Sequence, residues 1–167
     1  MNDRPVFLIG FMGSGKSTLG QQLADRLGWE FLDTDRLIEK REGLSVEQIF
    51  REQGEERFRE IESELAASLA GRTKIVVATG GGLFLRAKNR SILKSCGSTV
   101  WIDVPFEICI SRVGQGAGRP LWRPEDPLVF RAMFDRRAAS YALAETRIRV
   151  ASETADELVG RILAVFN

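Results

Sequence analysis

The sequence predicts an α/β protein in which helices cover both faces of a parallel sheet. Short apolar or β-branched segments recur along the 167 residues, and longer segments of helical period lie between them. Strands that alternate with helices favour parallel pairing, because each crossover helix packs back onto a face of the sheet. We therefore expect a three-layer α/β/α fold around a central sheet of five parallel strands.

Five segments have the composition of strands. The first, 6–9, reads Val-Phe-Leu-Ile, as expected of a parallel strand that is buried on both faces. The last, 146–150, alternates polar and apolar residues, which is typical of an edge strand. The expected strands are 6–9, 30–32, 74–78, 98–103 and 146–150.

Helical patterns fill the intervals between these strands. Ser45 with Gln48 forms a capping box for one helix, and Ser152 or Thr154 could cap the last one. The first helix opens at Ser17, directly after a glycine-rich run. The other expected helices lie near 36–42, 45–53, 55–70, 86–94, 105–112, 127–143 and 153–166.

The length of the chain predicts a single domain over 1–167. The formal net charge is +1, so the charge favours neither nucleic acid nor a membrane surface as a partner. No apolar run reaches membrane-spanning length, and a first strand at about Val6 leaves no room for a signal peptide. We expect a cytoplasmic monomer that acts on a small molecule.

The absence of histidine narrows the chemistry. Ser-His-Asp catalysis, Cys-His catalysis and His-ligated zinc are excluded, so a general base must be a carboxylate, Lys, Tyr or Cys. Cys96 and Cys109 are the two cysteines, and they form no metal or redox motif. Both are expected to be packing residues in a reducing compartment.

Residues 10–17 fit the phosphate-loop pattern Gly-x-x-x-x-Gly-Lys-Ser, placed between a strand and a helix. The loop amides and the helix dipole would hold phosphate oxygens, and Lys16 would add a full charge. The Ser17 hydroxyl can ligate Mg²⁺, so we expect ATP and Mg²⁺. A chance glycine-rich turn is the alternative. The expected nucleotide-binding residues are Gly13, Ser14, Gly15, Lys16, Ser17 and Thr18.

Asp33-Thr34-Asp35 follows the second strand, at the sheet edge where open α/β folds bind ligands. One carboxylate can hold Mg²⁺, and the other can accept a proton from an attacking hydroxyl. The alternative is a helix N-cap, which would explain one of the two.

Gly80-Gly81-Gly82 follows the third strand and Thr79. Three glycines allow a close approach to the backbone, and their N–H groups could bind substrate oxygens. A plain tight turn is the alternative reading.

Residues 113–127 contain three glycines and three prolines, which exclude regular structure. Arg119, Trp122 and Arg123 favour a mobile lid over bound phosphates, and a disordered surface loop is the alternative.

Two further pairs carry less information on their own. Arg59 and Glu62 share a helix face and can pair, but alone they suggest a solvated face. Arg137 and Tyr141 would also pass for surface residues.

These segments, in this order, resemble the shikimate kinase family. The matching segments are 9–18, Leu-Asp-Thr-Asp at 32–35, Ile-Phe at 49–50, Gly-Glu-Glu-Arg-Phe-Arg-Glu-Ile-Glu at 54–62, Gly-Gly-Gly at 80–82 and Arg-Pro-Leu at 119–121. The resemblance implies a P-loop kinase fold that transfers the γ-phosphoryl group of ATP to the 3-hydroxyl of shikimate in aromatic amino-acid synthesis.

The resemblance also implies residue roles. Lys16 and Arg119 would neutralise the transferring group, and Arg112 would stack on adenine. Ser17 and Asp33 would hold Mg²⁺, while Asp35 would act as base. Within a substrate-binding helical region at about 33–62, Glu62 would position Arg59. The acceptor would be held by Asp35, Arg59, Gly81, Gly82 and Arg137.

The chain departs from the family pattern around the acceptor. The family commonly shows Arg-x-Pro-Leu-Tyr where this chain has Arg137-Ala-Ala-Ser-Tyr141, and Arg136 is a neighbouring candidate for the same role. Trp122-Arg123 also replaces a usual small apolar residue after Leu121. The alternatives are a kinase of another hydroxy acid such as gluconate, and a non-catalytic nucleotide-binding relative.

Overall fold

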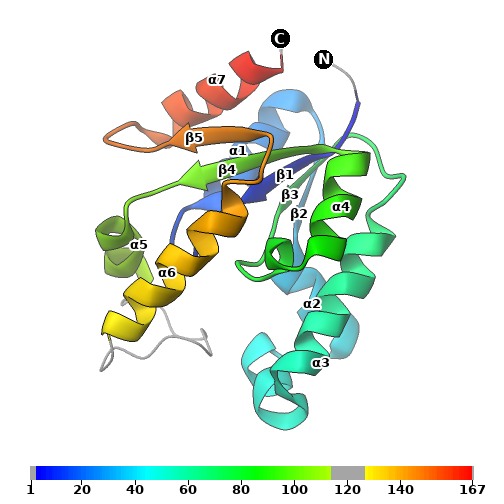
Figure 1. Cartoon of the computed structure of the whole chain (residues 1–167). Helices are drawn as coiled ribbons and strands as arrows, with labels where there is room; N and C mark the ends of the chain where they lie inside the picture. The colour runs from blue at the N-terminus through cyan, green and yellow to red at the C-terminus, as the bar shows by residue number, and fades with distance from the viewer. Residues whose placement is uncertain (1–2, 114–126, 167) are drawn as a thin grey trace.

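A computed structural model describes residues 3–113 and 127–166 of the chain. Its strands form one sheet in the order β2-β3-β1-β4-β5, and every neighbouring pair is parallel (Figure 1). The predicted five-stranded parallel sheet and the edge position of its last strand are confirmed. The strands are β1 (Val6–Ile9), β2 (Glu30–Asp33), β3 (Ile75–Ala78), β4 (Ser98–Asp103) and β5 (Thr146–Arg149).

Helices cover both faces of this sheet, which confirms the three layers. On one face α1 packs beside α7, and on the other η1 lies among α3, α4 and α6 (Figure 1). The helices are α1 (Lys16–Leu27), α2 (Thr34–Glu42), α3 (Val46–Ser68), α4 (Ala87–Cys96), α5 (Phe106–Val113), α6 (Pro127–Tyr141), α7 (Ala155–Val165) and the short 3₁₀-helix η1 (Leu83–Leu85).

The central position of β1 in the sheet explains why all of its residues are apolar. It pairs with β3 on one side and β4 on the other, and all four of its residues are buried. Only apolar side chains can occupy such a strand at low cost, because helices cover both of its faces. The phosphate loop therefore leaves the sheet from its middle.

The helix pair α2–α3 forms an arm beside the sheet with a small apolar core of its own, made of Ile38, Ile49, Phe58 and Ile61. The predicted break between 45–53 and 55–70 is confirmed: Gly54 is non-helical inside α3, with φ 85° and ψ 165°. The capping box of Ser45 and Gln48 is also confirmed.

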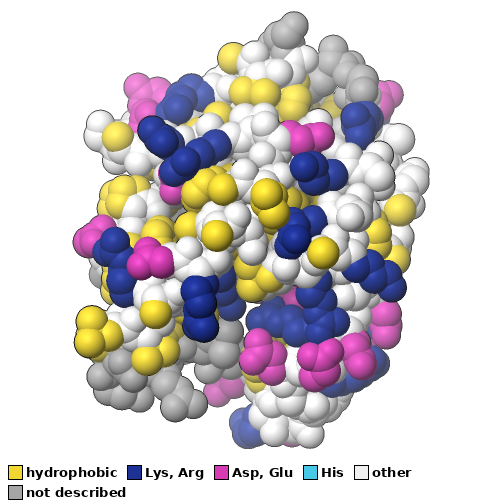
Figure 2. Space-filling model, in the orientation of Figure 1, with side chains coloured by type: hydrophobic (Ala, Val, Ile, Leu, Met, Phe, Trp, Pro, Cys, Tyr) yellow, Lys and Arg dark blue, Asp and Glu magenta, His cyan; other side chains and the backbone are white. Residues whose placement is uncertain are grey.

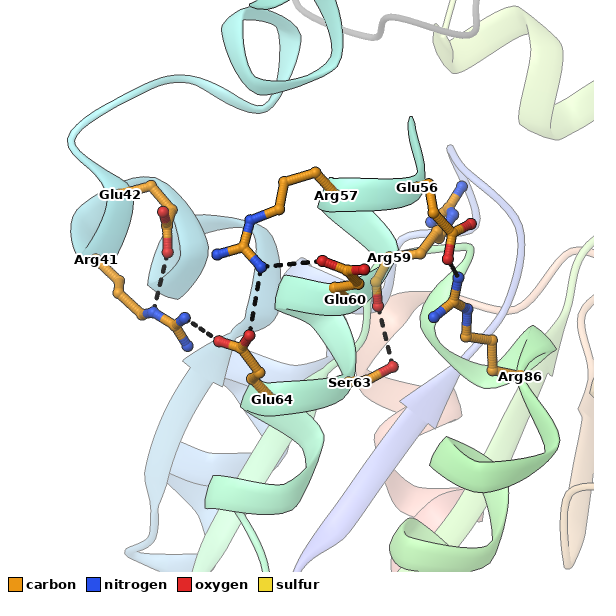
Figure 3. A network of polar contacts seen from close by, with 9 residues as sticks. All are labelled: Arg41, Glu42, Glu56, Arg57, Arg59, Glu60, Ser63, Glu64 and Arg86. Atoms are coloured by element: carbon orange, nitrogen blue, oxygen red, sulfur yellow. Dashed lines mark hydrogen bonds and ion pairs between the residues drawn. The ribbon is translucent and has the colours of Figure 1, made fainter. Parts of the chain in front are cut away.

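Ion pairs tie the outer faces of the arm together (Figure 3). Glu64 of α3 pairs with Arg41 of α2 and, at 3.4 Å, with Arg57 of α3. On the sheet side, Glu56 of α3 pairs with Arg86, which precedes α4, at 2.5 Å. Basic and acidic side chains accordingly gather together over α3 in Figure 2. Ion pairs therefore link α2 to α3 and α3 to the start of α4, in addition to the apolar core inside the arm.

Thr154, rather than Ser152, caps α7, in a capping box with Glu157. The lid expected at 113–127 falls outside the described residues except for its two ends. Within 3–113 and 127–166, no helix combines the length and the apolar character needed to cross a membrane.

Candidate active site

The phosphate loop owes its shape to glycines. Gly13 and Gly15 adopt φ of 77° and 86°, a left-handed conformation that side chains disfavour. A Cβ on Gly13 would also lie 2.4 Å from the carbonyl oxygen of Cys109. The loop is thus packed against α5, and α1 begins directly after it at Lys16. This arrangement directs the first amides of α1 and the positive end of its dipole at one point.

Lys16 folds back across this loop. Its amino group donates to the carbonyls of Gly10 and Phe11, at 2.8 and 2.9 Å, and to Ser14 Oγ at 3.2 Å. These contacts are to neutral acceptors that are close neighbours in the sequence. A phosphate bound at the loop would therefore meet a full positive charge within reach of the helix start.

Asp33 is a helix N-cap, as the alternative reading predicted, and it also contacts Ser17. Its Oδ1 accepts from the amides of Asp35 and Arg36 and so caps α2. Its Oδ2 accepts from Ser17 Oγ at 2.7 Å. The two residues expected to hold Mg²⁺ are therefore adjacent, although they lie 16 positions apart in the sequence.

A pocket of about 460 Å³ extends from the phosphate loop to the glycine turn that follows β3. Asp35 is on its wall, as are Arg36 and Thr79, which the sequence analysis did not single out. Its lining residues are Met12, Gly13, Gly15, Lys16, Ser17, Thr18, Asp33, Asp35, Arg36, Thr79, Gly80, Gly81 and Arg112.

A second pocket of about 290 Å³ adjoins the first and shares Gly15, Thr18 and Arg112 with it. Arg112 donates to the carbonyl of Gly13 at 3.2 Å, so its guanidinium lies at the boundary between the two. The other walls come from the phosphate loop, α1, the connection between β5 and α7, and α7 itself, through Ser14, Leu19, Val150, Glu153, Ala155 and Leu158.

Each glycine of the 80–82 turn makes room for a different charged side chain. A Cβ on Gly80 would lie 2.5 Å from Asp35 Oδ1, and one on Gly81 would lie 3.1 Å from an Arg137 nitrogen. A Cβ on Gly82 would lie only 1.9 Å from an Arg59 nitrogen. The turn-only reading is therefore insufficient, because three side chains from three helices pack on this backbone.

Arg59 and Glu62 are buried, so the solvated face that their spacing alone suggested is wrong. The predicted pairing is confirmed at 2.7 Å, with Glu62 only 1% exposed. The rings of Phe50 and Phe58 lie 5.8 and 5.4 Å from the Arg59 guanidinium. The apolar arm thus encloses a charged pair, which a spacing rule cannot distinguish from a surface pair.

Glu62 is close enough to Arg59, Asp35 and Arg137 to feel the charge of each. Burial raises its pKa to about 6, against the opposing attraction of Arg59, and the nearby Asp35 raises it further. Its other oxygen, Oε1, is buried without a hydrogen-bond partner in the described structure. Arg137 also acts on it electrostatically. We call Asp35, Arg59, Glu62, Arg137 and Tyr141, around Gly80–Gly82, the glycine-turn cluster.

Arg137 and Tyr141 are also buried, which overturns the surface reading of both. Arg137 is 7% exposed and lies 5.8 Å from the ring of Phe11, whereas Arg136 is exposed. The Tyr141 hydroxyl donates to the carbonyl of Gly81 at 2.5 Å, and burial raises the pKa of that hydroxyl to about 12. Arg137, and not Arg136, therefore belongs to the cluster.

Other expected residues stand apart from the first pocket. Arg59, Gly82 and Arg137 are not among its lining residues, although both arginines pack on the glycine turn that forms part of its wall. Arg119 lies outside the described residues. Thr34, whose role was not predicted from the sequence, is fully buried, and its hydroxyl oxygen accepts a hydrogen bond from the Gly80 amide at 2.7 Å. Its place between two aspartates was the available signal.

The donors present suit Mg²⁺ that is shared with a nucleotide. Ser17 and Asp33 offer hard oxygen ligands next to the phosphate loop. Among residues 3–113 and 127–166, no cluster of three or more acidic, Cys or His side chains could hold a metal by itself. Mg²⁺ usually takes one or two protein ligands together with waters and phosphates, so the pair fits this ion.

The fold and this pocket define a P-loop phosphotransferase: a glycine-rich loop with Lys16 at a helix start lines one pocket together with the Asp35 carboxylate. Comparison with known proteins identifies its family. A family model described as shikimate kinase matches residues 12–167, and the chain belongs to this family. It is therefore an ATP-dependent transferase of aromatic amino-acid biosynthesis that phosphorylates shikimate.

Individual relatives agree over almost the whole chain. The chain is 44% identical to a shikimate kinase of Microcystis aeruginosa over 95% of this chain and 84% of the relative. It is 39% identical to one of Persephonella marina, over 96% and 97% of the two chains. A solved shikimate kinase of Acinetobacter baumannii in complex with shikimate has a TM-score of 0.93 and 36% identity, covering 98% of this chain and 92% of that one.

Proposed function

We propose that the pocket aligns the γ-phosphoryl group of ATP with the 3-hydroxyl of shikimate, and that the glycine-turn cluster holds the acceptor. One observation carries this proposal. Asp35 and two buried arginines pack on a single turn, and part of that turn also lines the pocket of the phosphate loop. Phosphoryl transfer requires alignment and charge neutralisation more than covalent catalysis, and this layout supplies both.

On the nucleotide side, the amides of the phosphate loop would bind the β- and γ-phosphates. Lys16 would exchange its carbonyl acceptors for phosphate oxygens. Gly13, Ser14, Gly15, Ser17 and Thr18 complete the cradle. The second pocket would take the base and ribose, with Arg112 stacked on adenine at its boundary.

On the acceptor side, Arg59 and Arg137 would bind the carboxylate of shikimate, because guanidinium groups match carboxylates with two parallel hydrogen bonds. Both are buried and held in place by neighbours, so little side-chain entropy is lost when the acceptor binds. The amides of Gly81 and Gly82 would contact the substrate through the backbone.

Asp35 would accept the proton of the attacking hydroxyl. The hydroxyl oxygen then bonds to the γ-phosphorus, the bond from that phosphorus to the β–γ bridging oxygen breaks, and ADP leaves. Lys16 and the loop amides offset the charge that gathers on the phosphoryl oxygens. Arg119, on the lid expected at 113–127, would add a positive charge to the same group; it lies outside the described residues.

Mg²⁺ would be held by Ser17 and Asp33. When bound, it would neutralise the β- and γ-phosphate oxygens. Its test is direct: Asp33→Asn should raise the Mg²⁺ concentration needed for half-maximal turnover. In calorimetry, ATP titrated without Mg²⁺ should bind the variant and the parent protein equally.

The acceptor assignment is tested with matched arginines. Arg137→Lys should raise KM for shikimate about tenfold, because a buried two-pronged contact is lost, while KM for ATP changes little. Arg136→Lys, one residue away and exposed, is the control and should change neither. Equal behaviour of the two variants would remove Arg137 from the site. A coupled assay with shikimate against gluconate would separate the two acceptors.

We also propose that the protein acts as one domain over 1–167 and as a monomer in the cytoplasm. The support is a net charge of +1 and two free thiols, Cys96 and Cys109. Sedimentation at assay concentration would test the monomer.

A further inference from the structure

Arg59 is enclosed on nearly every side. Glu62 takes one terminal nitrogen at 2.7 Å, and the turn at Gly82 covers the guanidinium so closely that a Cβ would overlap it. Two aromatic rings flank it. Its side chain is only 11% exposed. A substrate carboxylate therefore has few approaches to this group.

The remaining terminal nitrogen of Arg59 is held by a different kind of partner. Glu55 accepts from it at 3.0 Å, and the Glu55 side chain is 57% exposed, whereas that of Glu62 is 1% exposed. Glu55 directly follows the break at Gly54, in the first turn of the second half of α3. Of the two carboxylates on Arg59, Glu55 is thus the one that water can readily replace.

We infer that Glu55 is a placeholder for the substrate carboxylate: it occupies one edge of Arg59 in the unliganded enzyme and is displaced when the acceptor binds. The inference rests on the proposed role of Arg59 as an acceptor clamp. Exchange of one carboxylate for another keeps a buried guanidinium paired throughout, which avoids the large cost of an unpaired buried charge. The exchange also lowers apparent substrate affinity, because Glu55 competes for the same donor.

The adjacent residue provides a matched control. Glu56 lies in the same turn and carries the same charge, but it pairs with Arg86 on the surface and is 78% exposed (Figure 3). Glu55→Gln and Glu56→Gln therefore change the net charge and the helix-terminus charge equally. Only the first removes a carboxylate from Arg59.

The experiment compares shikimate KM and calorimetric Kd in these two variants. A partly exposed ion pair contributes little free energy, so Glu55→Gln should lower both constants about threefold, with little change in KM for ATP. Glu56→Gln should leave them within about 1.5-fold of the parent protein. An unchanged or raised shikimate KM in Glu55→Gln would overturn the placeholder role, because a carboxylate that merely supports Arg59 would weaken binding when removed.

Arg59→Lys separates this inference from the proposed function. If Arg59→Lys raises shikimate KM and Glu55→Gln has no effect, only the placeholder is refuted. If Arg59→Lys leaves shikimate KM unchanged, the clamp and the placeholder are both refuted. In the double variant the gain from Glu55→Gln should vanish. If Glu55→Gln improves shikimate binding equally with Arg59 and with Lys at that position, Glu55 acts by long-range electrostatic repulsion and not through Arg59, which also overturns the proposal.

Discussion

The phosphate loop and the glycine-turn cluster, which we propose to bind the nucleotide and the acceptor, are built in opposite ways. The loop offers backbone amides and one lysine, all from residues 10–17. The cluster uses side chains from α2, α3 and α6, which meet on a turn after β3. A loop built from backbone is fixed by local geometry, whereas a cluster built from buried charges depends on every element that supports it. Changes at the cluster should therefore alter acceptor binding and leave ATP binding largely intact.

The largest effect is expected at Asp35, which belongs to the cluster and also lines the pocket of the phosphate loop. Asp35→Asn should lower turnover about 100-fold or more, because the variant cannot accept the hydroxyl proton. ATP affinity, measured by calorimetry, should stay nearly constant because the loop is untouched. Equal turnover in the variant would remove Asp35 from the mechanism.

Gly82→Ala tests how tightly the cluster is packed. The new Cβ would displace the Arg59 guanidinium, which Glu62 and Glu55 hold, and overpacking of this kind costs about 1–3 kcal/mol. Shikimate KM should rise about tenfold or more, at an unchanged KM for ATP. Gly160→Ala is the control, since nothing lies within 4 Å of a Cβ there. A normal KM in Gly82→Ala would show that Arg59 has room to move.

Glu62 should make the stability of the cluster depend on pH. Its folded-state pKa of about 6 lies above the ordinary value of 4.5, so protonated Glu62 favours the folded state. This contribution, about 2 kcal/mol, is complete below pH 4.5 and is lost as the pH rises through about 6. Urea unfolding of the parent protein and of Glu62→Gln should reveal this contribution: the difference in unfolding free energy between the two proteins should change between pH 4.5 and about 6.

Acceptor binding should move in the opposite direction. Below about pH 6 Glu62 is protonated and holds Arg59 less firmly, so shikimate KM should rise as the pH falls. This limb should be absent from the profile of Glu62→Gln. A parallel rise in both proteins would assign the titration to another group.

Tyr141→Phe should produce the smallest change. It removes the hydrogen bond to the Gly81 carbonyl and keeps the buried ring, which costs about 1 kcal/mol of unfolding free energy. Shikimate KM should rise only a few-fold, because the bond positions the turn and does not touch the substrate. Thermal unfolding and steady-state kinetics would check both values, and a KM shift without loss of stability would contradict this role.

The sequence predicted what depends on neighbours along the chain. The loop from Gly10 to Ser17 is one continuous segment, and Gly13 and Gly15 in it adopt a left-handed backbone conformation that favours glycine. Its pattern can therefore be recognised from the sequence. The capping box at Ser45, the break at Gly54 and the buried strand β1 are local for the same reason. Strand and helix alternation also determined the three layers, because crossover connections allow few arrangements.

Only the tertiary structure decided which charges are buried. Arg59, Arg137 and Tyr141 have the spacing of surface residues, and the family resemblance alone singled out the two arginines. Their neighbours are segments distant in sequence: the Gly82 turn packs on Arg59, and Gly81, Phe11 and Trp101 lie against Arg137 and Tyr141. No pattern within one helix records such contacts. Glu55 has the same sequence character as Glu56, yet one pairs with a buried guanidinium and the other with a surface arginine. Long-range packing sets that difference, because the environment of a charge is fixed by segments distant in sequence.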